Sequence, residues 1–274
     1  MQQTQIYQND GNQLVLNMLR PDARRILDIG CGAGDNARVL LTTRPGTKIV
    51  GITLSPAEAA IARAYLEQVH VADVEASDLS FITGTFDAIV CSHVLEHLKD
   101  PAAVLRRAVR FLKDGGQVVV AVPNVLELRN RVRLLMGRFD YEDAGVMDRT
   151  HLHFFTWYTA TKALIDPIPE LRSERKVTEG SLPLWWLRRL VLPTRASHWF
   201  DELATQAFPN LFGWQIVICA RLSSSSELAK RSTIENDEPG AQNQNVIFSP
   251  KRPRTGYKSI GNRKAREQSA PEWP

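Results

Sequence analysis

Two hydrophobic periods alternate along the first half of the chain. Short apolar runs, typical of strands buried on both faces, are separated by stretches with the i, i+3, i+4, i+7 spacing of amphipathic helices. The expected strands are residues 26–29, 48–53, 69–72, 86–91 and 117–122. This alternation predicts an α/β fold with a doubly wound sheet covered by helices on both sides.

Two of the expected helices begin with clear signals. Ser55-Pro56-Ala57-Glu58 combines a capping box with proline at the first helical position, and Asp100-Pro101 opens a further helix in the same way. Both signals follow an expected strand. They therefore support strand–helix–strand units.

The second half of the chain is less regular. Residues 154–165 are expected to form a helix, and residues 173–179 and 215–221 strands, whereas 182–212 shows no clear period. Residues 223–274 are polar and contain too few apolar side chains to offset the entropy of ordering. We therefore expect one domain over residues 1–222 and a disordered basic tail over 223–274.

Composition and charge narrow the function classes. The 274 residues are 43% hydrophobic and carry a net charge of +4. Residues 223–274 hold nine Lys/Arg against six Asp/Glu, so the expected domain is close to neutral. That balance argues against a nucleic-acid-binding face. Cys31, Cys91 and Cys219 lack metal-ligand spacing, and the start of the sequence lacks a secretory signal, which favours the cytoplasm.

The most informative segment is Ile26-Leu27-Asp28-Ile29-Gly30-Cys31-Gly32-Ala33-Gly34-Asp35. An apolar strand runs into a glycine-rich turn, where free N–H groups at the start of a helix face a ligand. A dinucleotide-binding loop would need its third glycine one residue later and an acid about 20 residues further on. Thr53 stands near that position.

The order Asp-x-Gly-x-Gly-x-Gly instead resembles the first motif of class I S-adenosylmethionine (SAM)-dependent methyltransferases. Further blocks with the same resemblance follow in order at 49–55, 73–74, 86–98 and 112–116. The resemblance implies a Rossmann-like sheet of seven strands in the order 3-2-1-4-5-7-6, with the last strand antiparallel. It also implies SAM as the cofactor.

The resemblance places the cofactor against a defined set of residues. These are Asp28, Gly30, Cys31, Gly32, Gly34, Thr53, Asp73, Val74 and Ser92. The loop and Asp28 would meet the methionine part of SAM, and Asp73 with Val74 the adenine. Two plainer readings stay open: Asp28 caps the following turn, and Asp73 simply ends a strand.

Thr53 departs from the family pattern, because most class I enzymes have an acid there for the ribose hydroxyls. The form Gly51-Ile52-Thr53-Leu54-Ser55 resembles cyclopropane-fatty-acid synthases and some small-molecule methyltransferases. A hydroxyl makes fewer hydrogen bonds to a diol than a carboxylate does. Glu58 is the candidate for sharing ribose recognition with Thr53. The alternative is that the Glu58 side chain completes the capping box with Ser55.

Three histidines carry candidate chemistry. His93 and His97 have helical spacing for a metal, but the family carries Leu-Glu-His here without one, so we expect no metal site. His93 is expected to face cofactor or substrate, and His97 to be structural. His151 lies in a segment resembling methyltransferases of bacterial polysaccharide clusters, where it would serve as general base. The alternative is that His151 or His153 hydrogen-bonds loop backbone.

The expected function is methyl transfer to a small-molecule, sugar or glycan acceptor, at oxygen. Two alternatives are a lipid-modifying enzyme of the cyclopropane-synthase kind and a SAM-fold binding protein without turnover, the latter prompted by Thr53. Paired tryptophans and arginines within residues 182–193 suggest peripheral membrane contact, an acceptor pocket or a buried lid helix.

Overall fold

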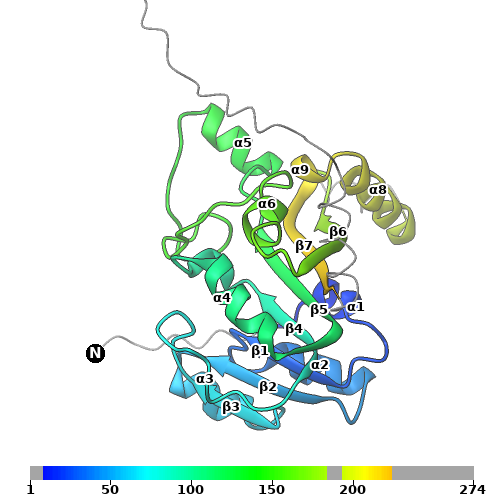
Figure 1. The fold of residues 1–274 in the computed structure, drawn as a ribbon. Helices are drawn as coiled ribbons and strands as arrows, with labels where there is room; N and C mark the ends of the chain where they lie inside the picture. Colours follow the sequence, from blue (N-terminus) through cyan, green and yellow to red (C-terminus); the bar gives the residue numbers. More distant parts are fainter. Residues whose placement is uncertain (1–8, 184–192, 224–274) are drawn as a thin grey trace, which may run out of the picture. The chain divides into compact units, whose positions relative to one another are not determined.

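A seven-stranded sheet organises the part of the chain that the computed structural model describes, residues 9–183 and 193–223. The strand order is β3-β2-β1-β4-β5-β7-β6 (Figure 1). Strands β1 to β5 are parallel, and β7 is antiparallel to both β5 and β6. The bounds are β1 Arg25–Ile29, β2 Lys48–Thr53, β3 Gln68–Val71, β4 Phe86–Ser92, β5 Leu112–Pro123, β6 Leu171–Gly180 and β7 Gly213–Leu222. The predicted order and the antiparallel final strand are confirmed.

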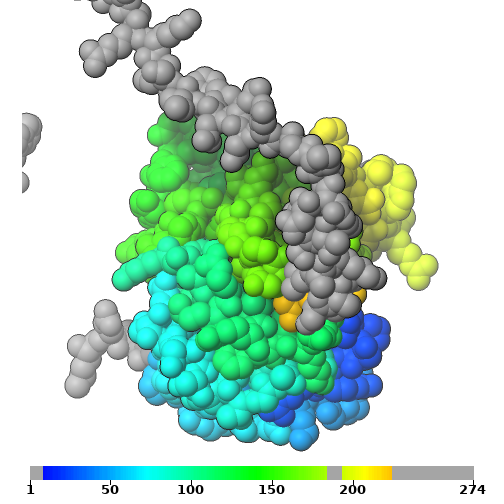
Figure 2. Space-filling view, viewed as in Figure 1, coloured from blue at the N-terminus to red at the C-terminus, as the bar shows by residue number. Residues whose placement is uncertain are grey.

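Helices cover both faces of this sheet. They are α1 Gln13–Met18, α2 Asp35–Thr43, α3 Pro56–Ala62, α4 Pro101–Ala108, α5 Leu128–Leu135, α6 Ala160–Leu164, α8 Thr194–Ala207 and α9 Pro209–Phe212. Consecutive strand residues point to opposite faces, so Leu27 joins one buried cluster with α4 and α6, and Ile26 joins another with α1 and α2. In space-filling view, the regions of α4 and α6 lie next to each other on the visible face (Figure 2).

The predicted helix starts are confirmed by their caps. Ser55 Oγ accepts a hydrogen bond from Glu58 N at 3.3 Å at the start of α3. Asp100 Oδ1 accepts from Ala103 N at 2.9 Å at the start of α4. These caps satisfy N–H groups that have no partner inside the helix.

Two secondary-structure predictions in the second half were wrong. The helix expected over 154–165 forms only as α6, because Phe155 pairs with Asn124 in an isolated bridge and buries its ring in the core. The stretch 182–212, expected to be irregular, contains α8 and α9. The helix α5 was not predicted. Tertiary contacts, rather than local periodicity, determine the secondary structure of these segments.

Some expectations fall outside the described residues. Positions 184–192 hold the paired tryptophans and arginines, and 224–274 hold nearly all of the basic tail, so both remain predictions. Within the described ranges, no helix is long and apolar enough to cross a bilayer. Cys31, Cys91 and Cys219 are buried free thiols.

Candidate functional site

The glycine loop lies at the carboxyl end of β1, where open α/β sheets bind ligands. The N–H groups of Gly30 and Cys31 both donate to Ile52 O at 2.9 Å, which ties the loop to β2. Gly34, with a φ of 85°, caps α2. Gly32 has a φ of 53°, and a Cβ built on it meets no atom within 4 Å. The loop therefore presents open space beside its backbone at Gly32.

Asp28 is a buried acid with an unmet hydrogen-bonding need. Its side chain lies in β1 between Gly51 of β2 and Val90 of β4, and Oδ1 has no hydrogen-bond partner among the described residues. Burial raises the pKa of Asp28 to about 7. A buried carboxylate without a partner is costly, so the position favours a ligand that brings a donor or a positive charge. The amino group of SAM fits that need.

Thr53 and Glu58 form one polar unit at the end of β2. The Thr53 hydroxyl donates to Glu58 Oε2 at 2.8 Å, and Thr53 Oγ1 accepts from Ser55 N at 3.2 Å. The Glu58 side chain thus turns to Thr53 instead of closing the capping box on Ser55. Glu58 of α3 thus places a carboxylate next to position 53, and ribose recognition by this carboxylate stays a prediction.

Asp73 and Val74 are held in a turn after β3. Asp73 Oδ1 accepts from Glu75 N at 2.8 Å, so the exposed carboxylate shapes its own loop. The Val74 side chain packs into the core, and its carbonyl accepts from an Arg107 guanidinium. The plainer reading of Asp73, a structural role where the strand ends, accounts for the hydrogen bond of one of its carboxylate oxygens. Adenine binding by this pair stays a prediction.

Ser92 and His93 mark the carboxyl end of β4. Ser92 Oγ lies 3.4 Å from Asn12 Nδ2, the side chain that also caps α1. His93 has a φ of 53°, a left-handed conformation that few residues other than glycine adopt. Its ring is thereby turned to Glu96 Oε1, 3.3 Å from Nδ1, and Gln215 Oε1, 3.0 Å from Nε2.

Both ring nitrogens of His93 are therefore occupied. Burial acts to lower the pKa of His93, but the hydrogen bond and charge of Glu96, with Gln215, outweigh it and raise the pKa overall. This geometry fits a residue that positions Glu96. Contact of His93 with cofactor or substrate stays a prediction.

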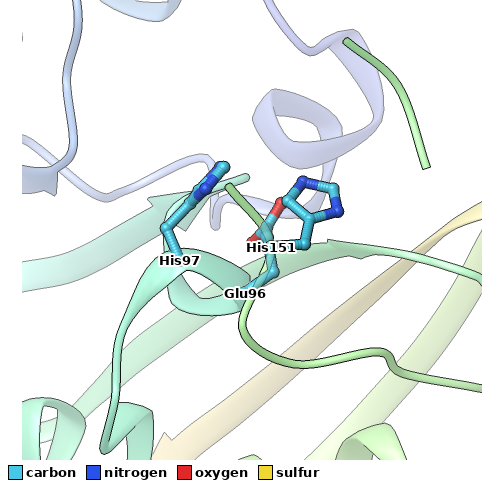
Figure 3. A group of neighbouring side chains, drawn as sticks. All are labelled: Glu96, His97 and His151. Carbon is cyan, nitrogen blue, oxygen red and sulfur yellow. The ribbon is translucent and has the colours of Figure 1, made fainter. Parts of the chain in front are cut away.

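Glu96, His97 and His151 converge next to this pair (Figure 3). Glu96 and His97 belong to a single 3-10 turn, Leu95–His97, and His151 comes from the loop between α5 and α6. The rings of His97 and His151 lie 4.8 Å apart, edge to face. Burial is the main cause that lowers the pKa of His151. His151 is accordingly a neutral imidazole near pH 7, as a general base requires.

The backbone alternative is observed for both loop histidines, and the role of His151 as general base stays a prediction. His151 Nδ1 lies 3.1 Å from Val146 O, and His153 Nε2 lies 3.1 Å from Lys99 O. Of these two histidines, only His151 brings its side chain to the Glu96 cluster among the described contacts. The structure thus brings His93 and His151, 58 positions apart in the sequence, close to the same carboxylate.

A cavity of about 450 Å³ lies beside the glycine loop. Its lining is Asn9, Asp10, Ala33, Asp35, Arg38, Ile61 and Tyr65. The cavity shares Ala33 with the loop but none of the predicted cofactor residues. Asp28 and the Thr53–Glu58 unit instead lie at the carboxyl ends of β1 and β2, which is where this fold class binds its ligands.

Comparison with known proteins decides the family. A family model described as "Methyltransferase domain" matches residues 5–162 of the chain. The chain belongs to this methyltransferase family. The methyltransferase domain is SAM-dependent, and the open loop at Gly32, the unpartnered oxygen of Asp28 and the Glu58 carboxylate fit that cofactor.

Curated relatives match part of this methyltransferase. The ubiquinone biosynthesis O-methyltransferase of Xanthomonas oryzae pv. oryzae (strain PXO99A) is 33% identical over 132 residues, which is 42% of this chain and 54% of that protein. The protein of the same description from Pseudomonas aeruginosa (strain LESB58) is 33% identical over 125 residues, 42% of this chain and 53% of that protein. The chain thus spans about half the length of these relatives.

A solved structure shows the same fold. The SAM-dependent methyltransferase from Archaeoglobus fulgidus has a TM-score of 0.50 and 20% identity, covering 76% of this chain and 93% of that chain. At this identity the likeness concerns the fold. It agrees with the class I sheet predicted for the methyltransferase.

Sequence reasoning missed three residues of the site. Gln215 and Glu179 were seen only as strand residues, and Asn12 not at all. Gln215 Nε2 donates to Glu179 Oε2 at 2.6 Å, and Asn12 Nδ2 donates to Gln215 Oε1 at 2.8 Å. A buried glutamine in an otherwise apolar strand was the available signal, because buried amides need partners.

Proposed function

We propose that this methyltransferase transfers the methyl group of SAM to an oxygen of a small-molecule acceptor, with sugars and glycans included in that class. The observation that carries the proposal is the unpartnered Asp28 oxygen beside a loop with open backbone at Gly32. The names of the relatives, O-methyltransferases of ubiquinone biosynthesis, support oxygen as the acceptor atom. A cytoplasmic location, favoured by three buried free cysteines, is part of the proposal.

The residues of the site lie in two neighbouring places, one that binds SAM and one that binds the acceptor. Asp28 holds the amino group of SAM, and Glu58, fixed by Thr53, meets the ribose hydroxyls. The acceptor lies over the carboxyl end of β4, near Glu96 and His151. SAM supplies a methyl group on a sulfonium with a good leaving group, so alignment for in-line attack is the protein's main contribution. His151, neutral near pH 7, is the base for the hydroxyl proton.

The Thr53–Glu58 hydrogen bond bears on the alternatives. A binding protein without turnover was prompted by the missing acid at position 53, and Glu58 supplies that acid. The lipid-modifying alternative rested on the form of residues 51–55 and on the Trp/Arg segment, and residues 184–192 of that segment lie outside the described part of the chain. Oxygen methylation is the function we retain.

The test is calorimetric titration of the full chain with S-adenosylhomocysteine (SAH). Gly32→Ala is expected to abolish binding, because its Cβ enters the open space of the loop. Gly46→Ala is the matched control, since Gly46 also has a positive φ, 86°, and open surroundings but lies between α2 and β2. Both variants carry similar backbone strain. Failure of the folded wild type to bind SAH would overturn the proposal.

A second step concerns the acceptor. Wild-type protein with isotope-labelled methyl SAM is incubated with dihydroxy aromatics, sugars and glycans, and products are analysed by mass spectrometry and NMR. A labelled methyl ether supports the proposal. Label in a ring carbon of a lipid would instead establish the lipid-modifying alternative.

A further inference from the structure

Three side chains with metal-ligating atoms meet at the carboxyl end of β4: Glu96, His97 and His151 (Figure 3). One ligand atom of each lies within 4.8 Å of those of the other two. His97 and Glu96 are neighbours in one turn, whereas His151 reaches the cluster from a distant loop. The loop is pinned there, because Leu152 N donates to Glu96 O at 2.8 Å.

Hydrogen bonds determine which nitrogen of each imidazole carries the proton. His151 Nδ1 lies 3.1 Å from Val146 O, an acceptor only, so Nδ1 carries the proton. His97 Nδ1 lies 3.0 Å from Thr150 Oγ1, whose own hydroxyl donates to Asp148 at 2.7 Å. His97 Nδ1 is therefore also the protonated nitrogen. Both histidines keep a lone pair on Nε2, the arrangement of metal-ligating histidines.

The carboxylate of Glu96 is held in a similar way. Only 1% of the residue is exposed, and Oε1 lies 3.3 Å from His93 Nδ1. The second oxygen, Oε2, is buried with no hydrogen-bond partner among the described residues. Such an oxygen is costly in a folded protein unless a donor or a cation reaches it. His93 thus orients the carboxylate and leaves one oxygen for a ligand.

We propose that Glu96, His97 and His151 bind one divalent first-row transition-metal ion. Two imidazole nitrogens and one carboxylate oxygen are a common protein ligand set for such ions and leave coordination positions open. Two ligands with bonds of about 2.1 Å stand at most about 4.2 Å apart, so the cluster contracts by several tenths of an ångström on binding. The expectation of no metal concerned His93, Glu96 and His97, whereas the structure places His151 beside Glu96 and His97 and turns the His93 ring to Glu96 and Gln215.

This inference rests on the proposed function and deepens it. An acceptor with two neighbouring oxygen atoms would fill open positions of the ion. The ion would stabilise the oxyanion, so the bound hydroxyl would lose its proton to solvent. The oxygen would then form the bond to the methyl carbon as the carbon–sulfur bond breaks, and SAH would leave. With the ion bound, His151 would give its lone pair to the metal, so the ion would replace His151 in the role of base that the proposed function gives to this residue.

The experiment is titration of tag-free, metal-stripped full chain with CoCl₂, followed by visible absorbance and calorimetry, and repeated with ZnCl₂ and MnCl₂. One equivalent of at least one ion is expected to bind. His97→Ala and His151→Ala should each weaken that binding at least about tenfold. His153→Ala is the matched control, because His153 lies two positions from His151 and contacts Lys99 O instead. It should bind the ion as wild type does.

Two further readouts keep the outcome decisive. Circular dichroism and thermal unfolding in EDTA establish that each variant is folded. After EDTA is removed, the added ion should raise the unfolding midpoint of wild type and His153→Ala but not that of His97→Ala or His151→Ala. Thr150→Val, which removes the Oγ1 partner of His97 without touching a ligand, should weaken binding less than His97→Ala. The inference is overturned if wild type binds none of the three ions at one equivalent, or if the His97 and His151 variants bind equally well.

SAH titration in EDTA separates this inference from the proposed function. If SAH binds and methyl transfer proceeds in EDTA, the catalytic role of the ion is disproved and the proposed function stands, while the metal site itself is decided by the ion titration. If the ion binds but SAH does not, the proposed function fails and the metal site stands without its catalytic role.

Discussion

Nε2 of His93 lies 3.0 Å from Oε1 of Gln215, and this contact joins the carboxyl end of β4 to the start of β7. The amide nitrogen of Gln215 donates to Glu179, so its oxygen faces His93 and accepts a hydrogen bond from Nε2–H. Nδ1 of His93 is left for Glu96. A glutamine on an antiparallel strand thereby determines how a histidine holds the central carboxylate of the site.

Gln215→Leu should release His93 and lower stability. The substitution leaves the Nε2–H group of His93 and the Asn12 amide without their acceptor, at a cost of about 1–3 kcal/mol in the free energy of unfolding. SAH affinity should be unchanged and kcat reduced. Urea unfolding and steady-state kinetics measure both, with Gln68→Leu on the exposed edge strand β3 as control. Wild-type stability in Gln215→Leu would contradict the network.

Asp28 should make stability depend on pH. Burial raises its pKa from 3.8 to about 7, so between these values the folded state binds a proton that the unfolded state lacks. The contribution of Asp28 is therefore most favourable below about pH 4 and declines until about pH 7. Asp28→Asn removes that slope and should gain up to a few kcal/mol over wild type above pH 7. Urea unfolding across this range tests it, with exposed Asp22→Asn as control.

Binding of SAH should also release a proton from Asp28. The amino group of the ligand favours the ionised carboxylate, so near pH 6 binding drives its deprotonation. Calorimetry in two buffers of different ionisation enthalpy measures the release. A wild-type protein with no buffer dependence, or an Asp28→Asn variant with the same dependence, would show that Asp28 does not face the ligand.

Thr53 and Glu58 should act as one unit in ribose binding. Glu58→Gln removes the charge that accepts the ribose hydroxyls and should weaken SAH binding, whereas Thr53→Val should act mainly by loosening Glu58. The double variant should therefore lose less than the sum of the single losses in binding free energy. Calorimetry of the four proteins tests this, with Glu67→Gln, an exposed acid paired with Lys48, as control. Additive losses would mean that the two side chains work separately.

Asp87 should stabilise the fold without affecting the site. It accepts hydrogen bonds from Arg24 N, Arg25 N and Lys113 Nζ at the amino ends of β1 and β4, opposite the glycine loop. Burial acts to raise the pKa of Asp87, but these bonds and the Lys113 charge outweigh it and lower the pKa. Its contribution is thus present above about pH 4 and is lost as the pH falls below that value.

Asp87→Ala should lower the free energy of unfolding by about 2 kcal/mol near pH 7, and less in acid. SAH affinity should equal that of wild type. Guanidine unfolding at several pH values measures the first effect, and Asp114→Ala, at an exposed position next to Lys113, is the control. An equal loss at all pH values would assign the effect to packing.

The sequence alone determined the sheet and the cofactor loop. The bounds of β2, the starts of α3 and α4 and the glycines of the motif at 26–35 follow from local patterns, because buried parallel strands must be apolar and a tight strand-to-helix turn needs glycine. The strand order followed from the resemblance of the sequence motifs to class I methyltransferases, and the structure confirms it. The helical periodicity of residues 154–165 did not predict the structure of residues 154–159 correctly. There, burial of Phe155 and its bridge to Asn124 prevail over the local helical pattern.

Only the tertiary structure decided what surrounds Glu96. The side chains beside this carboxylate come from two segments: His93 and His97 lie within 93–97, with His93 oriented through Gln215 of β7, and His151 arrives with a loop pinned to the Glu96 backbone. Linear spacing paired His93 with His97, whereas the left-handed backbone at His93 turns that ring to Gln215 and leaves the place beside His97 to His151. Contacts between distant segments depend on chain packing, which no local pattern of residues encodes.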